Sequence, residues 1–347
     1  MSAPLRFAII GYGHIGTRHA HHIQQHPDAQ WVGVCDTNPE RRALAEQAGI
    51  PAYETPEALF EAQHPDVVSV CTPNFLHAQH SIVSLQHGAN VLCEKPMALS
   101  TAECDAMIQA AEKAQRIIFV VKQNRYNEPV QQVKQLLEQN RLGKLYWIGI
   151  NCFWNRNEAY YKQSTWRGQK ATDGGALFTQ FSHFVDILYY LFGDIQNQGC
   201  GLLRNAHHPY NDTEDTGSIV TALLDGTPVN INFSTCSYQK NMEGAITILA
   251  EKGTVKMGGQ YLNTIEYQCL EGEALPHIPM QAKANDYGLY QGSMSNHDRV
   301  IDNVVKTLRG EANAMTNAMD GKTVVNIIEK LYAMANTNIN LGSAREK

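Results

Sequence analysis

Three glycines near the N-terminus have the spacing of a turn that can accept phosphate groups. Gly11, Gly13 and Gly16 directly follow an apolar run and lead into a stretch with helical periodicity, and Asp36 ends the next apolar run. A strand, a glycine turn, a helix and an acid after the second strand form the pattern of dinucleotide-binding units. We therefore predict a dinucleotide site at this turn. Its predicted contacts are Gly11, Tyr12, Gly13, His14, Ile15 and Gly16.

Each glycine of the turn has its own physical task. Gly11 permits the tight turn, Gly13 lets the backbone approach a pyrophosphate, and Gly16 lets the helix pack closely on the strand. The N-terminus of the helix adds backbone N–H groups and the positive end of the helix dipole, both of which attract phosphate.

Asp36 points to one of the two common nicotinamide dinucleotides. Its carboxylate can accept hydrogen bonds from ribose hydroxyls and repels a 2′-phosphate, so NAD is favoured over NADP. Arg41 and Arg42 follow closely and could weaken that repulsion. We interpret them instead as solvated charges on the next helix.

Two polar motifs follow apolar runs that we expect to be buried strands. The first contains Thr72, Pro73, Asn74 and His77, and the second is Glu94-Lys95-Pro96. Ligands of open parallel sheets bind at the carboxyl ends of the strands, where both motifs would lie. We predict cofactor contacts from Thr72, Pro73, Asn74, His77, Glu94 and Lys95. The competing interpretation of Lys95 is an ordinary surface lysine in a strand–helix loop.

A predicted helix over residues 175–192 carries His183. At 100° per residue its large apolar side chains gather on one side, and Thr179, His183, Asp186 and Tyr190 share a stripe on the other. This stripe predicts a helix that faces a cleft, with Thr179 and His183 toward a substrate. The alternative is that His183 is a hydrogen-bonded histidine of the core.

Residues 153–168 are rich in aromatic and cationic side chains. Aromatic faces suit the apolar side of a sugar ring, and guanidinium and ammonium groups suit an anion. We predict substrate contacts from Arg156, Tyr161 and Lys162. Trp166 and Arg167 are candidates for the cofactor, and the sequence does not separate substrate contacts from cofactor contacts in this segment. An exposed loop with ordinary charges is the competing interpretation.

Five histidines near the N-terminus raise the question of a metal site. They are His14, His19, His21, His22 and His26. No cysteine, aspartate or glutamate accompanies them at ligand spacing, so we interpret them as solvent-facing and predict no metal site.

The elements that would position these residues change in kind along the chain. Short β-branched runs alternate with helical stretches up to about residue 120, which predicts a parallel sheet built from βαβ units. The expected strands there are residues 5–10, 31–35, 66–71, 90–93 and 117–121, and the expected helices include 77–86 and 101–115. Further on, helices are expected at 128–139, 175–192, 296–308 and 321–336, and strands at 144–155, 217–224, 228–236, 245–250, 254–257 and 264–269.

This organisation predicts two domains. We expect an α/β Rossmann domain over residues 1–124, followed over residues 125–347 by an α+β domain with a large, open, mostly antiparallel sheet.

Composition excludes several classes of function. The 347 residues are 43% hydrophobic, with 28 Lys and Arg against 34 Asp and Glu, a net charge of −6. Such a chain can bury a core and has no basic surface for nucleic acid or anionic membranes. We expect no membrane span and no signal peptide. The eight cysteines are scattered, several within apolar runs, which is typical of reduced thiols in a cytoplasmic protein.

The motifs together resemble those of the glucose–fructose oxidoreductase/inositol dehydrogenase/rhizopine catabolism (Gfo/Idh/MocA) family. The resemblance rests on the glycine turn, the motif at residues 72–77, Glu94-Lys95-Pro96 and the glycine-led segment 173–186 that carries His183. It implies that an NAD(P) nicotinamide lies against an open sheet, with the substrate between. Lys95 matches the family's catalytic lysine, and His183 matches its second acid/base. Many polyol-oxidising members carry an aspartate where this chain has Thr179, which leaves Lys95 and His183 as the acid/base pair.

The resemblance also suggests a substrate and an assembly. Tyr160-Tyr161-x-x-Ser164-x-Trp166-Arg167-Gly168 resembles a loop of members that oxidise C3 of UDP-N-acetylglucosaminuronic acid. We therefore expect an NAD-dependent dehydrogenase for a secondary alcohol of a sugar or sugar nucleotide, assembled as a homodimer or homotetramer. Two alternatives remain open within the family, an NAD-recycling glycosidase and a sensor without catalytic activity.

Overall fold

The contacts of the chain divide it into two compact units. The computed structural model describes residues 3–206, 210–276, 284–286 and 291–336. Unit 1 comprises Met1–Tyr126, Lys170–Gly174 and Ser295–Val325, and unit 2 comprises Asn127–Gln169, Gly175–Met294 and Asn326–Lys347. The division predicted at residue 124 treats each domain as continuous in sequence. In the structure, two later segments group with unit 1, because α11 (His297–Leu308) packs on α1 (His14–Gln25).

The strands of unit 1 form a parallel six-stranded sheet in the order β3-β2-β1-β4-β5-β6. This is the order of doubly wound dinucleotide-binding sheets, and it confirms the predicted α/β fold. The strands are β1 (Leu5–Ile10), β2 (Ala29–Cys35), β3 (Ala52–Tyr53), β4 (Val67–Val70), β5 (Asn90–Cys93) and β6 (Ile118–Val120).

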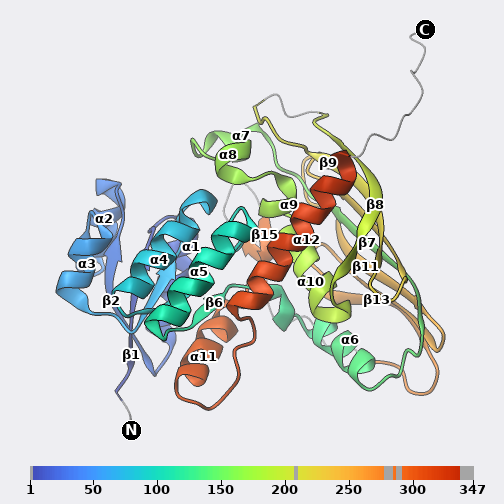
Figure 1. The fold of residues 1–347 in the computed structure, drawn as a ribbon, viewed down its shortest axis with the longest axis horizontal. Coiled ribbons are helices and arrows are strands. Elements are labelled where there is room, and N and C mark those ends of the chain that lie inside the picture. The colour runs from blue at the N-terminus through green and yellow to red at the C-terminus, as the bar shows by residue number, and fades with distance from the viewer. Residues whose placement is uncertain (1–2, 207–209, 277–283, 287–290, 337–347) are drawn as a thin grey trace. The chain divides into compact units, whose positions relative to one another are not determined.

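Helices link the strands of this sheet, and α4 and α5 lie side by side (Figure 1). Besides α1 and α11, the helical elements of unit 1 are α2 (Pro39–Gln47), α3 (Pro56–Gln63), η1 (Asn74–Leu76), α4 (His77–Gln86), α5 (Thr101–Ala114), η2 (Gln123–Tyr126) and α8 (Lys170–Asp173). Ser100 caps the N-terminus of α5, where its hydroxyl accepts the Glu103 N–H at 3.2 Å. α12 (Ala318–Asn336) begins in unit 1 and ends in unit 2.

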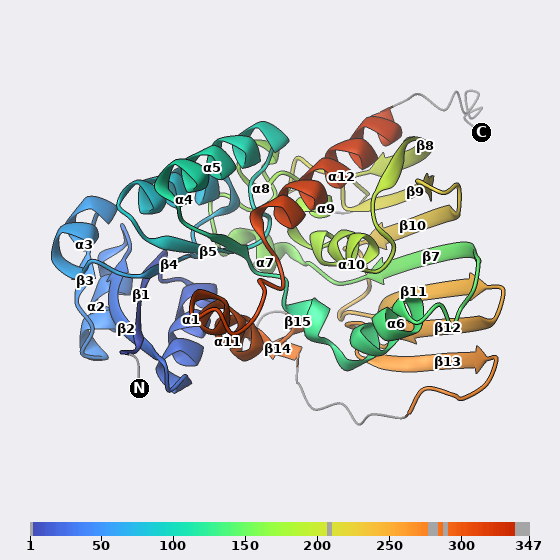
Figure 2. The ribbon, with the colours of Figure 1, turned by 60° about the horizontal axis from the view of Figure 1, so that its bottom comes forward.

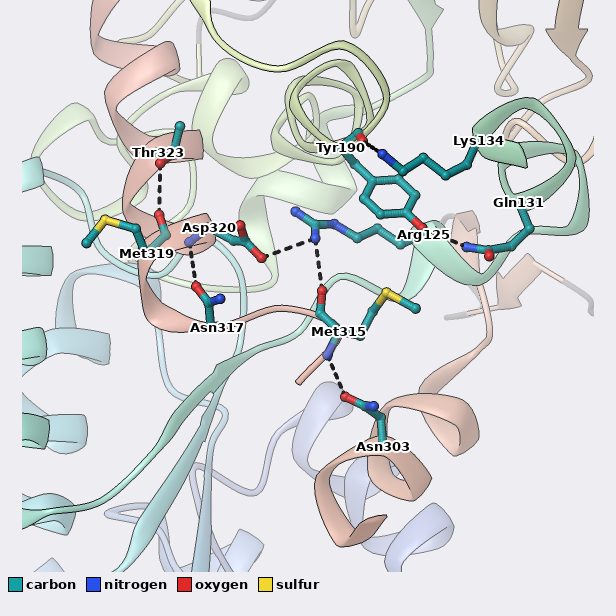
Figure 3. A network of polar contacts seen from close by, with 10 residues as sticks. All are labelled: Arg125, Gln131, Lys134, Tyr190, Asn303, Met315, Asn317, Met319, Asp320 and Thr323. Carbon is teal, nitrogen blue, oxygen red and sulfur yellow. Dashed lines mark hydrogen bonds and ion pairs between the residues drawn. The ribbon is translucent and has the colours of Figure 1, made fainter. Parts of the chain in front are cut away.

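A buried polar network fixes the chain around α11. The Arg125 guanidinium donates to the Met315 carbonyl at 3.0 Å and lies 3.4 Å from the Asp320 carboxylate (Figure 3). Asn303 of α11 accepts the Met315 N–H at 2.8 Å. Val300, Ile301 and Val304 of α11 belong to the hydrophobic core that packs against the parallel sheet of unit 1. A segment from the last third of the sequence, Ser295–Val325, thus completes unit 1.

The strands of unit 2 form a seven-stranded sheet in the order β13-β12-β11-β7-β10-β9-β8. All neighbours are antiparallel except β7 and β10, which confirms the predicted mostly antiparallel sheet. The strands are β7 (Leu145–Phe153), β8 (Ile195–Arg204), β9 (Thr216–Leu223), β10 (Pro228–Ser234), β11 (Glu243–Ala250), β12 (Gly253–Gly258) and β13 (Thr264–Leu270), with β14 (Ala284–Asp286) and β15 (Gln291–Met294) as a separate pair.

One face of this sheet is covered by helices, and α6 (Glu128–Glu138) and α10 (Ser182–Phe192) lie in front of it in Figure 2. Four isoleucines that are paired across neighbouring strands are buried on that face: Ile219, Ile231, Ile150 and Ile246. The opposite row carries exposed side chains, among them Val220 and Tyr267.

One predicted helix of unit 2 was wrong, and one strand was missed. The single helix expected at 175–192 is two, α9 (Ala176–Thr179) and α10. The reason is a widened turn, in which the Phe181 N–H bonds the carbonyl of Ala176 rather than that of Leu177. The edge strand β8 was missed, because its outer positions are exposed and it contains two glycines, so neither strict alternation nor an apolar run marks it.

The helices within the described ranges are too short or too polar to cross a membrane.

Candidate active site

The glycine turn leaves space only where a phosphate group would need it. A Cβ on Gly16 would lie 2.1 Å from the Gly11 carbonyl oxygen, and one on Gly11, whose φ is +92°, would lie 2.8 Å from Thr72 N. Both positions therefore exclude any side chain. A Cβ on Gly13 would meet no atom within 4 Å. The backbone at Gly13 is thus open to a ligand, at the N-terminus of α1.

Asp36 is fixed by the same turn. One carboxylate oxygen accepts the Tyr12 N–H at 2.7 Å, and the other accepts the Asn38 N–H at 2.8 Å. A carboxylate offers about four lone-pair positions, so both oxygens can accept a further hydroxyl proton. Arg42 donates to the Asp36 carbonyl at 2.8 Å and is half-buried, so it holds the loop rather than standing solvated as predicted.

His77 joins the two predicted strand-end motifs. Its Nδ1 lies 2.6 Å from the Pro96 carbonyl oxygen and its Nε2 lies 2.9 Å from the Thr72 carbonyl oxygen. Burial lowers the pKa of His77, and the two carbonyls oppose that shift. Asn74 donates to the Asp173 carbonyl at 3.0 Å. The motifs that the sequence places after β4 and β5 are therefore in direct contact within unit 1.

Glu94 holds the backbone next to Lys95. One of its carboxylate oxygens accepts the Lys95 N–H at 3.0 Å, and the other lies 3.1 Å from Nε2 of His19. Burial alone would raise the pKa of Glu94, but His19 and His297 outweigh burial and hold it well below its usual range. Lys95 itself is half-buried and precedes a cis peptide bond to Pro96.

The histidines of α1 differ in exposure. His14 and His21 are exposed, which confirms the prediction for these two. His19 is buried, with 1% of its surface exposed, so its predicted solvent-facing position was wrong. The reason is its place on the inner side of α1, toward Glu94.

In unit 2, Thr179 and His183 lie on separate helical segments. The Thr179 hydroxyl donates to the Gly175 carbonyl at 2.6 Å, and His183 lies in the first turn of α10. Thr179, His183 and Asp186 are all buried, so the predicted polar stripe is as enclosed as the apolar side.

Glu214 is a half-buried group at this segment that sequence reasoning missed. Its Oε1 accepts the Leu177 N–H at 3.3 Å and the Tyr332 hydroxyl at 2.6 Å, and so anchors the start of α9. Burial raises the pKa of Glu214 above its ordinary value. It lies in a polar run, Asn211-Asp212-Thr213-Glu214-Asp215, in which no pattern marks which carboxylate anchors α9.

The aromatic and cationic segment folds around Tyr160. The Arg156 guanidinium lies 5.3 Å from the Tyr160 ring and donates to Asn241 Oδ1 at 3.2 Å. Arg156 is 3% exposed, so the competing interpretation of an exposed loop does not hold for this predicted substrate contact. Arg167 lies 4.6 Å from the Tyr160 ring and 5.5 Å from that of Trp166.

The other two predicted contacts of this segment have contrasting positions. Tyr161 is buried, with its ring perpendicular to that of Tyr160 at 5.0 Å. Lys162 is exposed and forms an ion pair with Glu158 at 2.7 Å, one helical turn away.

The predicted residues thus form one group in each unit. In unit 1 the structure brings together the glycine turn, Asp36, the motif at 72–77 and the lysine loop. In unit 2 it gathers Arg156, Tyr161 and Arg167 around Tyr160, which also accepts a hydrogen bond from Gln180, beside Thr179 in the chain.

Two family models match the two parts of the chain. The model "Oxidoreductase family, NAD-binding Rossmann fold" covers residues 5–122, and the "GFO/IDH/MocA C-terminal domain" covers residues 130–256. The crystal structure of the WlbA dehydrogenase from Bordetella pertussis in complex with NADH and UDP-GlcNAcA is similar, with a TM-score of 0.86 and 33% identity. That match covers 96% of this chain and 97% of the other.

The chain belongs to the Gfo/Idh/MocA oxidoreductase family. It is 31% identical over 195 residues to the D-glucoside 3-dehydrogenase of Escherichia coli K12, a match that covers 55% of each protein. It is 28% identical over 292 residues to the glucose-6-phosphate 3-dehydrogenase of Bacillus subtilis 168, covering 81% of this chain and 82% of that enzyme. The match to the E. coli enzyme thus spans about half of that enzyme's length. The resemblance inferred from the motifs is confirmed.

The residues of unit 1 fit an NAD(P) dinucleotide. The open space at Gly13 suits a pyrophosphate, and the fixed Asp36 carboxylate suits ribose hydroxyls. The NAD(P)-binding Rossmann domain of this family is therefore present in unit 1.

Proposed function

We propose that this protein is an NAD-dependent dehydrogenase that oxidises a secondary alcohol of a nucleotide-linked sugar acid, such as UDP-N-acetylglucosaminuronic acid. The observation that carries the proposal is the likeness, along 96% of the chain, to a dehydrogenase crystallised with NADH and UDP-GlcNAcA. The sugar dehydrogenases among the curated relatives support the same reaction class.

Lys95 and His183 are the proposed acid/base pair. When bound, the nicotinamide supplies the hydride acceptor for the carbon that is oxidised. Lys95 donates a hydrogen bond to the oxygen on that carbon, and His183 accepts the hydroxyl proton. In the reductive direction His183 returns the proton. The support is the match of both residues to the family's motifs and the fixed backbone of Lys95, whose N–H is bound to Glu94 at 3.0 Å.

Asp36 supports NAD rather than NADP as the cofactor. Its two oxygens are aligned by the Tyr12 and Asn38 N–H groups, so a ribose can be held in one orientation. A 2′-phosphate in the same place would meet a fixed negative charge.

The substrate class is supported by the cluster around Tyr160. Arg156 and Arg167 bring two guanidinium groups onto its ring, which suits a substrate that has both a sugar ring and anionic groups. Tyr161 and Trp166 add aromatic surface at the same segment. Lys162 and Thr179 complete the proposed substrate contacts.

The uncovered face of the seven-stranded sheet supports self-association into a homodimer or homotetramer. Leu202, Val220, Leu249 and Tyr267 lie on that face, and between 39% and 55% of each side chain's surface is exposed. Exposed apolar side chains gathered on one face are typical of protein interfaces.

A substrate panel tests the proposed function. The purified protein is mixed with NAD⁺ and, in turn, with free sugars, polyols and UDP-sugars, and the absorbance at 340 nm is followed. We expect NADH to accumulate with UDP-sugar acids. NADH with free sugars alone would contradict the nucleotide-linked substrate. Silence across the panel, with NAD bound to the protein, would replace the proposal by an NAD-recycling glycosidase or a sensor.

A further inference from the structure

Three residues that are far apart in the sequence meet inside unit 1. His19 lies on α1, Glu94 follows β5, and His297 is the first residue of α11. His19 and His297 are each 1% exposed and Glu94 is 6% exposed. One ligand atom from each lies within 4.8 Å of the others.

Hydrogen bonds do not account for all the polar atoms of this cluster. His19 Nε2 bonds Glu94 Oε1 at 3.1 Å, but His297 Nε2 lies 3.7 Å from the same oxygen, beyond hydrogen-bond range. Both ring nitrogens of His297 and Nδ1 of His19 are buried without a hydrogen-bond partner in the described structure. A buried polar atom left in this state costs about 1–3 kcal/mol, so some further group at this point would stabilise the fold.

The separations match the edges of a metal coordination shell. Two ligands at zinc-like bond lengths of about 2.1 Å in tetrahedral geometry are about 3.4 Å apart. The observed separations of 3.1 and 3.7 Å from Glu94 Oε1 lie on either side of that value. A cation would need only small shifts of the three side chains.

The side-chain types also suit a cation. Metals bind an ionised carboxylate and neutral imidazoles, and the three residues bring one carboxylate and two imidazoles to the same point.

We propose that His19, Glu94 and His297 bind one borderline divalent cation, of the class of Zn²⁺ or Co²⁺. Two imidazoles and one carboxylate favour such ions over Mg²⁺ and Ca²⁺, which prefer all-oxygen ligands. The cation joins α1, the end of β5 and α11. The other oxygen of Glu94 accepts the Lys95 N–H, so the same ion steadies the backbone at Lys95.

No local pattern in the sequence marks this site, and we predicted none. His19 stands among four other histidines near the N-terminus, whereas its proposed co-ligands lie 75 and 278 positions further along the chain. Only the packing of α11 on α1 brings His297 to the other two.

Metal titration of the full-length protein tests the proposal independently of any activity. The reduced protein is stripped with a chelator, freed of it and titrated with Co²⁺ while the visible spectrum is recorded. We expect about one equivalent per chain to bind, with absorption typical of nitrogen and oxygen ligands and no thiolate band. His297→Ala should weaken binding by more than about tenfold, since even outer partners of metal ligands contribute that much.

A matched control separates this site from adventitious binding. His21→Ala removes an exposed histidine from the same helix and should bind Co²⁺ as the wild type does. If His297→Ala does not fold, Glu94→Gln and His19→Gln keep the side-chain shapes and should show the same loss. No binding above background by the wild type, or equal binding by wild type, Glu94→Gln and His19→Gln, would overturn the proposal and leave a hydrogen-bonded cluster only.

Discussion

At the scale of single residues, the proposed preference for NAD over NADP rests on the carboxylate of Asp36. It is held by two backbone N–H groups at 2.7 and 2.8 Å and faces the position where a ribose would lie. Its effect on selectivity is therefore one of charge, with the loop geometry already fixed by the backbone.

Replacing Asp36 by serine should shift cofactor use toward NADP. Hydrogen bonds to a charged group contribute about 1.5–3 kcal/mol, so kcat/KM for NAD⁺ should fall by roughly tenfold or more. The value for NADP⁺ should rise, because the repulsion of a 2′-phosphate is gone. Steady-state kinetics with both cofactors measures this. Asp36→Asn, which keeps one acceptor oxygen, serves as the control, and an unchanged NAD⁺ to NADP⁺ ratio in both variants would contradict the assignment.

Glu214 makes the stability of the protein depend on pH. Burial raises its pKa above the ordinary value of 4.5. The unfolded chain therefore releases this proton first as the pH rises, and the folded state loses stability from about pH 4.5 up to the folded pKa.

Glu214→Gln should remove this loss. Glutamine keeps an oxygen for the Leu177 N–H and the Tyr332 hydroxyl and cannot ionise. We expect the variant to melt higher than the wild type at pH 8 and close to it at pH 4.5, as measured by thermal unfolding. A difference that is the same at both pH values would show that folding does not raise the pKa of Glu214.

At the scale of elements, alanine substitutions at two glycines of one turn should have different effects, one on stability and the other on cofactor binding. Gly16→Ala places a Cβ 2.1 Å from the Gly11 carbonyl oxygen, so we expect a loss of about 1–3 kcal/mol in stability. Gly13→Ala meets no atom within 4 Å and has a φ of −79°, so it should fold normally. Its methyl group instead occupies the space for a pyrophosphate and should weaken NADH binding. Thermal melting and NADH fluorescence titration separate the two effects, and equal melting temperatures with equal affinities would contradict the model of the turn.

The sequence was most informative where a pattern is local. β1, β5 and α4 have the predicted bounds, and β11 to β13 are close to theirs, because periodicity and turn residues act over a few positions. The break between α9 and α10 was not predictable in this way, since residues 175–192 have continuous helical periodicity and one shifted hydrogen bond at Phe181 divides them.

Contacts over long sequence distances explain the remaining differences. His19 and Glu214 were misread or missed because their burial depends on partners far away in the chain, Glu94 for the first and Tyr332 for the second. Arg156 was predicted to contact a substrate, but its enclosure by Trp154, Tyr160 and Asn241 was not predictable from the sequence. The residue types at these positions were visible in the sequence, but their neighbours were not.

At the scale of the whole molecule, the open sheet face should govern assembly. Val220 and Leu202 project from the uncovered side of β9 and β8. We expect the wild type to be a dimer or tetramer and the double variant Leu202→Glu, Val220→Glu to be smaller, because a buried charge without a partner is costly. Light scattering after size exclusion gives the masses. A wild-type monomer, or an oligomer that both substitutions leave intact, would contradict this interface.

The most direct test of the proposed reaction is a single-turnover measurement of NADH formation from NAD⁺ and UDP-N-acetylglucosaminuronic acid by the wild type, Lys95→Met and His183→Asn. A positioned acid or base contributes about 10²–10⁴-fold to such a step. We predict that the wild type forms NADH and that each variant is slower by at least about 100-fold, while NADH fluorescence shows that the cofactor still binds. No NADH from the wild type, or near-normal rates in either variant with the cofactor bound, would contradict the account.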